Sequence, residues 1–212
     1  MQVDLSSALI DAGRWIDRQG WCPATGGNFS ARLDAEQALV TASGRHKGGL
    51  TEADFLTVDL HGKPIVDSAI ASPQAASLKP SAETLLHTRL YQLDKQIGAV
   101  LHTHSVASTV LSRLEPQAWL TLSGYEMQKS LAGNMTHDAA IQLALFDNTQ
   151  DMSLLADQLA LRWQQAPLSW GFLVRGHGLY AWGRDVHEAR RHLEGLEFLF
   201  ACELEMRRLA VK

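Results

Sequence analysis

The stretch IGAVLHTH, residues 97–104, is an apolar run that ends in two histidines separated by a single residue. A short apolar run of this kind is typical of a buried β-strand. Side chains two positions apart on a strand point to the same face of the sheet. His102 and His104 are therefore expected to reach one metal ion from a rigid strand end.

A third histidine, His177, lies between two glycines in RGHG, residues 175–178. We predict two short strands over 171–182 around this turn, whose glycines permit close backbone approach. Three neutral imidazoles with a free coordination position are typical of catalytic zinc. Spacing alone leaves open whether His177 meets the other two. Some of the other histidines, such as His61, His187 and His192, are expected on the surface.

Apolar periodicity and turn residues predict the remaining elements. Helices are expected over 5–16, 80–91, 106–114 and 153–165, and after Asp185 at the end of the chain. Strands are expected over 29–33, 38–41 and 119–123, with a hairpin over 55–66, loops over 43–49 and 70–79, and a weak strand or short helix over 138–145. Hairpins with inserted helices favour an α/β fold with a mostly antiparallel sheet.

Composition places the chain among ordinary globular proteins. Of its 212 residues, 46% are hydrophobic and 20% charged, which fits one domain over 1–212. A net charge of −4 gives no basic surface for nucleic acid or an anionic membrane. No signal-peptide pattern and no long apolar span are visible, and the two isolated cysteines suit a reducing compartment. We expect a cytoplasmic protein.

Five short motifs then occur in a characteristic order. They are GGNFS around Asn28, the pair Ser43-Gly44, KPSAE at 79–83, HTH at 102–104 and RGHG at 175–178. In this order they resemble the class II aldolase family, which includes fuculose-phosphate aldolase and ribulose-phosphate epimerase. The resemblance covers nearly the whole chain. It implies a three-layer α/β/α fold, one zinc per subunit on His102, His104 and His177, and a homotetramer with sites near subunit interfaces.

Within this family, the likeness is strongest to the branch that dehydrates 5-methylthioribulose 1-phosphate in methionine salvage. It rests on Glu126-Met127, Lys129 and HGLYAWG at 177–183. The aldolases and epimerases carry a tyrosine in their C-terminal tail, whereas residues 206–212 contain none. The resemblance therefore implies a zinc-dependent dehydratase. An aldolase, an epimerase and a non-catalytic adducin-like structural module are the alternatives.

Two carboxylates compete for the acid/base role that such a reaction needs. Glu126 matches the acid/base position of the dehydratase branch and is the expected principal group. Glu83 matches that of the aldolases, and is expected to tune the metal or share proton transfer. Residues expected to bind the phosphate are Asn28, Ser43, Gly44, Ser81 and Lys129, with Lys79 and Arg45 as added charge. No residue pattern identifies the pocket for the methylthio group.

Overall fold

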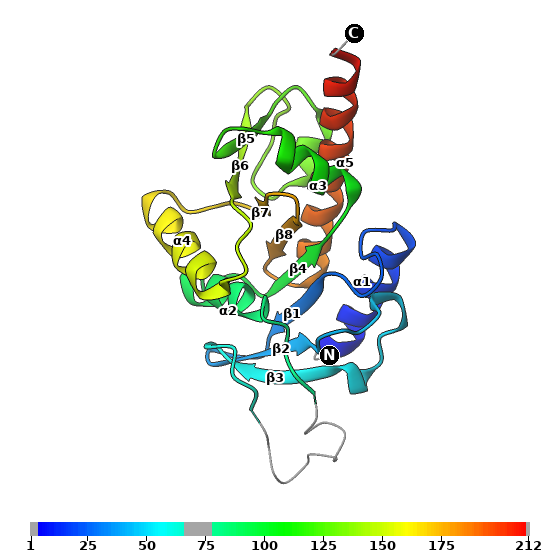
Figure 1. The fold of residues 1–212 in the computed structure, drawn as a ribbon, viewed down its shortest axis with the longest axis vertical. Coiled ribbons are helices and arrows are strands. Elements are labelled where there is room, and N and C mark those ends of the chain that lie inside the picture. Colours follow the sequence, from blue (N-terminus) through cyan, green and yellow to red (C-terminus); the bar gives the residue numbers. More distant parts are fainter. Residues whose placement is uncertain (1–3, 66–77, 211–212) are drawn as a thin grey trace.

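The computed structural model describes residues 4–65 and 78–210, and one β-sheet runs through them (Figure 1). The eight strands lie in the order β3-β2-β1-β4-β8-β7-β6-β5. They are β1 Asn28–Arg32, β2 Gln37–Thr41, β3 Phe55–Asp59, β4 Ala99–Thr103, β5 Trp119–Leu122, β6 Ile141–Phe146, β7 Gly171–Val174 and β8 Gly178–Gly183. β4, which carries His102, is central and buried along its whole length.

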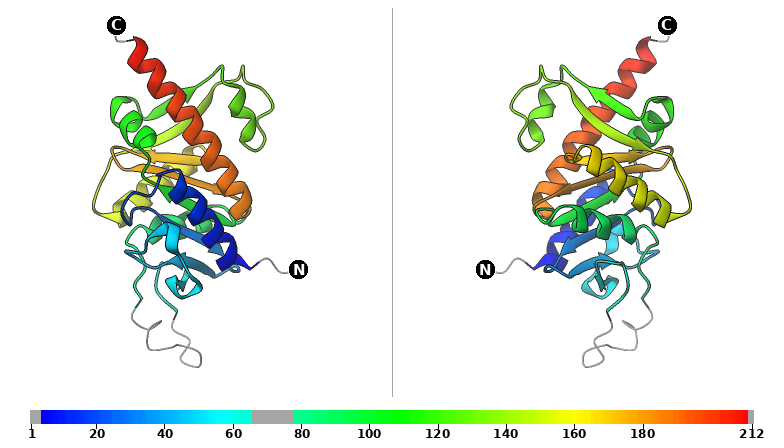
Figure 2. Two further views of the ribbon diagram at one scale, coloured as in Figure 1. Left: turned by 90° about the vertical axis from the view of Figure 1, so that its right-hand side faces the viewer. Right: turned by 90° about the vertical axis from the view of Figure 1, so that its left-hand side faces the viewer.

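Helices cover both faces of this sheet (Figure 2). The helices are α1 Leu5–Arg18, α2 Thr84–Leu93, α3 Val106–Leu114, α4 Met152–Gln165 and α5 Val186–Ala210, with 3-10 turns η1 Lys47–Gly49, η2 Glu52–Asp54 and η4 Glu126–Ser130. α1, α3 and α5 share one apolar core with the sheet, and α2 and α4 share the other. The three-layer α/β/α architecture is therefore confirmed.

Strand alternation decides which layer each residue of β4 meets. Ala99 and Leu101 belong to the core under α1, α3 and α5, whereas Val100 belongs to the core under α2 and α4. Because successive side chains point to opposite faces, His102 faces the α2 side and Thr103 faces α5. The metal-ligand candidate of β4 therefore points toward the start of α2.

Helix starts follow N-cap residues that the sequence supplies. Asp4, Ser105 and Asp151 each accept hydrogen bonds from backbone N–H groups of the first turn, in α1, α3 and α4. Ser105 directly follows His104, so its cap starts α3 at the point where the chain leaves β4. The cap of Ser105 thus helps to set the backbone direction at His104.

Most predicted elements are present, with small corrections. The uncertain segment 138–145 forms strand β6, and the helix predicted from Pro80 begins at Thr84 because Ala82 and Glu83 form a turn. Part of the predicted loop, 70–77, lies outside the described residues. In residues 4–65 and 78–210, no helix is both long and apolar enough to cross a membrane.

One surface prediction is wrong. His192 is only 3% exposed, whereas His61 and His187 lie on the surface as expected. Its Nδ1 donates to the carbonyl oxygen of Trp182 at 2.7 Å, and its Nε2 accepts from the backbone N–H of Ala132 at 3.0 Å. His192 therefore joins α5 to β8 as a structural residue, because both ring nitrogens find backbone partners.

Candidate metal centre and its cleft

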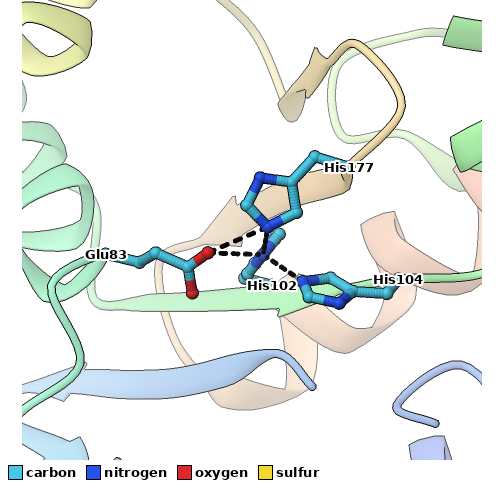
Figure 3. Close-up of side chains that lie close together, drawn as sticks. All are labelled: Glu83, His102, His104 and His177. Atoms are coloured by element: carbon cyan, nitrogen blue, oxygen red, sulfur yellow. Dashed lines mark hydrogen bonds and ion pairs between the residues drawn. The ribbon is translucent and has the colours of Figure 1, made fainter. Parts of the chain in front are cut away.

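Three histidines converge at the end of β4 (Figure 3). The Nε2 atom of His102 lies 2.8 Å from Nε2 of His104 and 3.2 Å from Nε2 of His177. His177 lies on the turn between β7 and β8. Because β8 pairs with β4, this turn lies next to the end of β4. The sheet therefore brings together the three imidazoles that the sequence singled out, including the one that spacing left open.

The donor set fits a metal ion. Nδ1 of His102 donates to the carbonyl oxygen of Leu179 at 2.9 Å, so the Nε2 of the neutral ring carries a lone pair that points into the cluster. A single N–H hydrogen could bridge this lone pair to only one of the two neighbouring Nε2 atoms. A metal cation, in contrast, could accept a lone pair from all three nitrogens. Ligands about 2.0–2.1 Å from a tetrahedral zinc lie roughly 3.3 Å apart, close to the separations observed.

Burial favours the neutral form of His102 and His104. Desolvation lowers the pKa of His102 well below its ordinary value, and it lowers the pKa of His104 to about 4. A protonated imidazole has no lone pair for a metal. For His102 and His104, the buried setting therefore favours the form of the ring that acts as a ligand.

A carboxylate completes the cluster. Glu83, from the turn before α2, places Oε1 2.8 Å from Nε2 of His177 and 3.7 Å from Nε2 of His102. Its other oxygen accepts from Nδ2 of Asn28 at 2.5 Å. Burial raises the pKa of this carboxyl, but the contact with His177 and the electrostatic effect of the three neighbouring histidines outweigh it and bring the pKa to about 2. Glu83 is thus held as an anion beside the three rings.

An aromatic residue that was not singled out from the sequence orients His102. Tyr180 is its direct partner across β4 and β8, and the two rings stack with centroids 3.8 Å apart. Phe172 stacks on the other face of Tyr180 at 4.7 Å. The ring of His102 is therefore fixed by packing as well as by its hydrogen bond. The cross-strand register, invisible in the sequence, was needed to find this contact.

Close backbone approach around the site explains its glycines. A β-carbon on Gly178 would collide with the carbonyl oxygen of Thr103, and one on Gly26 would lie 2.8 Å from Nδ1 of His104. The loop that contains Gly26 is held by Lys47, which is 1% exposed. Its Nζ donates to the carbonyl oxygens of Thr25 at 2.9 Å and Arg45 at 2.6 Å. Lys47 therefore joins the two loops that were predicted to bind phosphate.

A cleft of about 570 Å³ opens onto the cluster. Its lining residues are Ser43, Ser81, Ala82, Glu83, His104, Asn148, Gln150, Met152, Gly176 and His177. Two predicted phosphate-binding residues, Ser43 and Ser81, are among them. Asn28 lies behind the cleft against Glu83, and Gly44 adjoins Ser43 with open space beside it. The wall at 148–152 was not predicted, although its polar residues directly follow an apolar strand.

The structure does not bring Glu126 or Lys129 into this cleft within one chain. Both lie on η4, which packs beside α5, and the side chain of Glu126 is 71% exposed. Nζ of Lys129 donates to Glu126 at 2.8 Å, and Nδ1 of His137 lies 3.5 Å from the same carboxylate. The hydrogen bond from Lys129 lowers the pKa of Glu126. The two predicted carboxylates therefore occupy different regions and different environments.

Comparison with known proteins gives one consistent result. A model of the Class II Aldolase and Adducin N-terminal domain matches residues 7–204. The chain is 57% identical over 205 residues to a methylthioribulose-1-phosphate dehydratase of Serratia proteamaculans, covering 97% of this chain and 96% of that relative. A dehydratase of the same name from Pectobacterium atrosepticum is 56% identical over 206 residues, with the same coverage of both chains.

Solved structures agree on the fold. The L-fuculose-1-phosphate aldolase from Thermus thermophilus has a TM-score of 0.75 and 25% identity, and the alignment covers 100% of both chains. A sugar-phosphate aldolase from Thermotoga maritima has a TM-score of 0.66 and 16% identity over 96% of each chain. The second likeness bears on the fold alone. The sheet and its helical layers thus have relatives of known architecture.

Proposed function

We propose that this chain, which belongs to the Class II Aldolase and Adducin N-terminal domain family, is a metal-dependent dehydratase of 5-methylthioribulose 1-phosphate. The products are 2,3-diketo-5-methylthiopentyl 1-phosphate and water, a step of methionine salvage. The observation that carries the proposal is the cluster of three imidazoles and Glu83 in an open cleft. It occurs in a chain that is 57% identical to a dehydratase over nearly its full length.

The metal in this proposal is zinc, one per subunit, held by His102, His104 and His177. Nitrogen donors and a three-histidine set favour zinc among the common divalent ions. When bound, the cation supplies Lewis-acid stabilisation of negative charge that develops on the oxygens of the substrate. Glu83 lies against two of the rings, so its anionic charge strengthens the hold on a cation and tunes it.

The protons are moved by a carboxylate. A base removes the hydrogen on C3, next to the C2 ketone, and an acid protonates the hydroxyl that leaves C4 as water. The resulting enol at C3 and C4 returns its hydroxyl proton to C4, which gives the 2,3-diketone. Glu126 takes the C3 proton and delivers it to the leaving hydroxyl, so one carboxylate serves as base and then as acid.

Glu126 performs this role from a neighbouring subunit of a homotetramer. Its exposure leaves it free to enter another chain's cleft, and burial there would raise its pKa toward the range that suits a general acid/base. Lys129 accompanies it on the same turn and adds positive charge for the phosphate. Ser43, Gly44 and Ser81 bind the phosphate from the chain that holds the metal, and Asn28 supports them through Glu83.

The protein works in the cytoplasm. Cys22 and Cys202 are free thiols, which a reducing compartment preserves. The net charge of −4 argues against nucleic acid and anionic membranes as partners.

In the decisive experiment, the purified protein is incubated with 5-methylthioribulose 1-phosphate, once in the presence of zinc and once in the presence of a chelator. We expect the diketone to form with zinc and its formation to stop in the chelator. Release of dihydroxyacetone phosphate would instead indicate an aldolase, and an epimeric pentulose phosphate would indicate an epimerase. A zinc-loaded protein that converts no substrate would favour an adducin-like structural module.

A further inference from the structure

Four strands of the sheet end at the same edge, where the cleft lies. β2 and β4 run in the same direction because both are antiparallel to β1, and β7 joins them because β4 and β7 are both antiparallel to β8. β6 is parallel to β7. Ser43, His104, His177 and Asn148 follow these four strands. The strand order therefore places the metal cluster between Ser43 on one side and Asn148 on the other.

The two ends of the cleft differ in chemistry. At the β2 end, the hydroxyl groups of Ser43 and Ser81 line the cleft, and the buried ammonium of Lys47 holds the loops behind them. At the β6 end, the lining consists of Asn148, Gln150 and Met152. Hydroxyl groups with a positive charge behind them suit a phosphate, whereas the thioether of Met152 offers a phosphate no hydrogen-bond donor.

Charged neighbours at the β6 end are already engaged elsewhere. The carboxylate of Asp147 accepts from Nε of Arg175 at 3.0 Å, and the same guanidinium also donates to the carbonyl oxygen of Gln117 at 2.7 Å. The carboxylate of Asp151 accepts from the backbone N–H groups of Ser153 and Leu154, both at 3.0 Å. Both carboxylates thus have their own partners, and the three side chains that line the β6 end of the cleft carry no charge.

The substrate of the proposed function has the same asymmetry. Its phosphate is on C1 and its methylthio group on C5, with the ketone and hydroxyls between them. If the central oxygens face the metal cluster, the two ends must extend in opposite directions along the cleft. We propose that the β6 end binds the methylthio group, and that Met152 is its apolar contact and a specificity-determining residue. This inference rests on the proposed function and adds the subsite that the sequence left open.

Met152 is suited to this contact by its position. It is the first residue of α4, half-buried, and it packs against the apolar core under that helix. The cap of Asp151 holds the N–H groups of Ser153 and Leu154 in the first turn of α4, while the side chain of Met152 lines the cleft. A thioether is unbranched and polarisable, so it can adapt to the sulfur and methyl of a ligand. Contacts of this size change specificity by about tenfold or more.

The test compares two ligands that differ only at C5. One is 5-methylthioribulose 1-phosphate, followed as substrate, and the other is ribulose 1-phosphate, which carries a hydroxyl there and is followed as a competing inhibitor. For Met152→Ala we expect kcat/KM for the substrate to fall about tenfold, with the inhibition constant of ribulose 1-phosphate changed less than about twofold. Met152→Leu should restore most of the loss, and zinc content should not change.

Two further variants keep the test decisive. Met152→Gln retains the length of the side chain and should shift the preference in the same direction as Met152→Ala. Met206→Ala, on the exposed end of α5, is the matched control and should alter neither constant. Equal losses for both ligands, or no loss for either, would overturn the inference while an active wild type leaves the proposed function standing. An inactive wild type would overturn both.

Discussion

Glu83 and Glu126 are carboxylates from the same chain with opposite surroundings. Glu83 is enclosed by His177, His102 and Asn28, and its place is complete within one subunit. Glu126 is exposed on η4 and meets only surface partners there. The fold of one chain therefore assembles the candidate metal centre, whereas the acid/base role proposed for Glu126 requires a second chain. In this account, Glu83 helps to hold the cation and Glu126 moves the protons. Each substitution below tests this division of roles.

Removing a ligand should have the largest effect. His102→Ala deletes the ring whose Nε2 lies within 3.2 Å of both other ring nitrogens. We expect most of the zinc to be lost and activity to fall by more than about 100-fold, beyond the loss known for residues that only support a ligand. Metal analysis and the dehydration assay measure both. His61→Ala, on the surface, is the control, and a His102→Ala protein that keeps its zinc and activity would refute the centre.

Glu126→Gln should leave the metal and remove turnover. The substitution keeps the shape of the side chain but removes the acid/base group, so we expect kcat to fall about 10²- to 10⁴-fold with zinc content unchanged. Glu205→Gln is a matched control, because Glu205 is also exposed and paired with a cation three residues later, Arg208. A fully active Glu126→Gln enzyme would remove Glu126 from the mechanism.

Glu83→Gln should weaken the metal more than the chemistry. The amide removes the negative charge beside His102 and His177, so we expect zinc affinity to fall about 10- to 100-fold. Saturating zinc should then recover most of the turnover. Titration of activity against free zinc separates the two effects. An enzyme that is dead at saturating zinc would make Glu83 the principal acid/base and the assignment of Glu126 wrong.

A third carboxylate, Glu197, extends the comparison, and its substitution should have the smallest effect. Glu197 is 2% exposed and accepts from Thr103 at 3.1 Å and Ser105 at 2.5 Å, and within residues 4–65 and 78–210 it forms no ion pair. Burial raises its pKa to about 7, in contrast with Glu83. Between its ordinary pKa of 4.5 and about 7, the folded state therefore holds a proton that the unfolded state has lost, so stability falls as pH rises through this window.

We accordingly expect Glu197→Gln to gain stability relative to wild type above pH 7, by at most about 3 kcal/mol, and little below pH 4.5. Urea unfolding of both proteins at pH 4.5 and pH 8 measures the difference. Glu194→Gln, exposed on the same helix, should show no such dependence. A stability difference that does not vary with pH would contradict the explanation.

The sequence predicted the parts of the site that depend on local pattern. Alternation along one strand predicted that His102 and His104 lie close together, and their Nε2 atoms are 2.8 Å apart, although β4 ends at Thr103 and His104 lies just beyond it. His177 needed the family resemblance, because its distance from β4 depends on the pairing of β4 with β8. The wall at 148–152 was missed because it reaches the cleft through strand order alone. The stacking of Tyr180 likewise depends on register, which no local pattern specifies.

Subunit complementation tests the division between the two carboxylate regions most directly. His102→Ala and Glu126→Gln chains, each inactive alone, are coexpressed with different tags and purified as a mixed oligomer. If Glu126 acts across the interface, about a quarter of the sites combine intact ligands with an intact Glu126, and activity should return to about a quarter of wild type. A mixed oligomer no more active than its two parents would contradict the account.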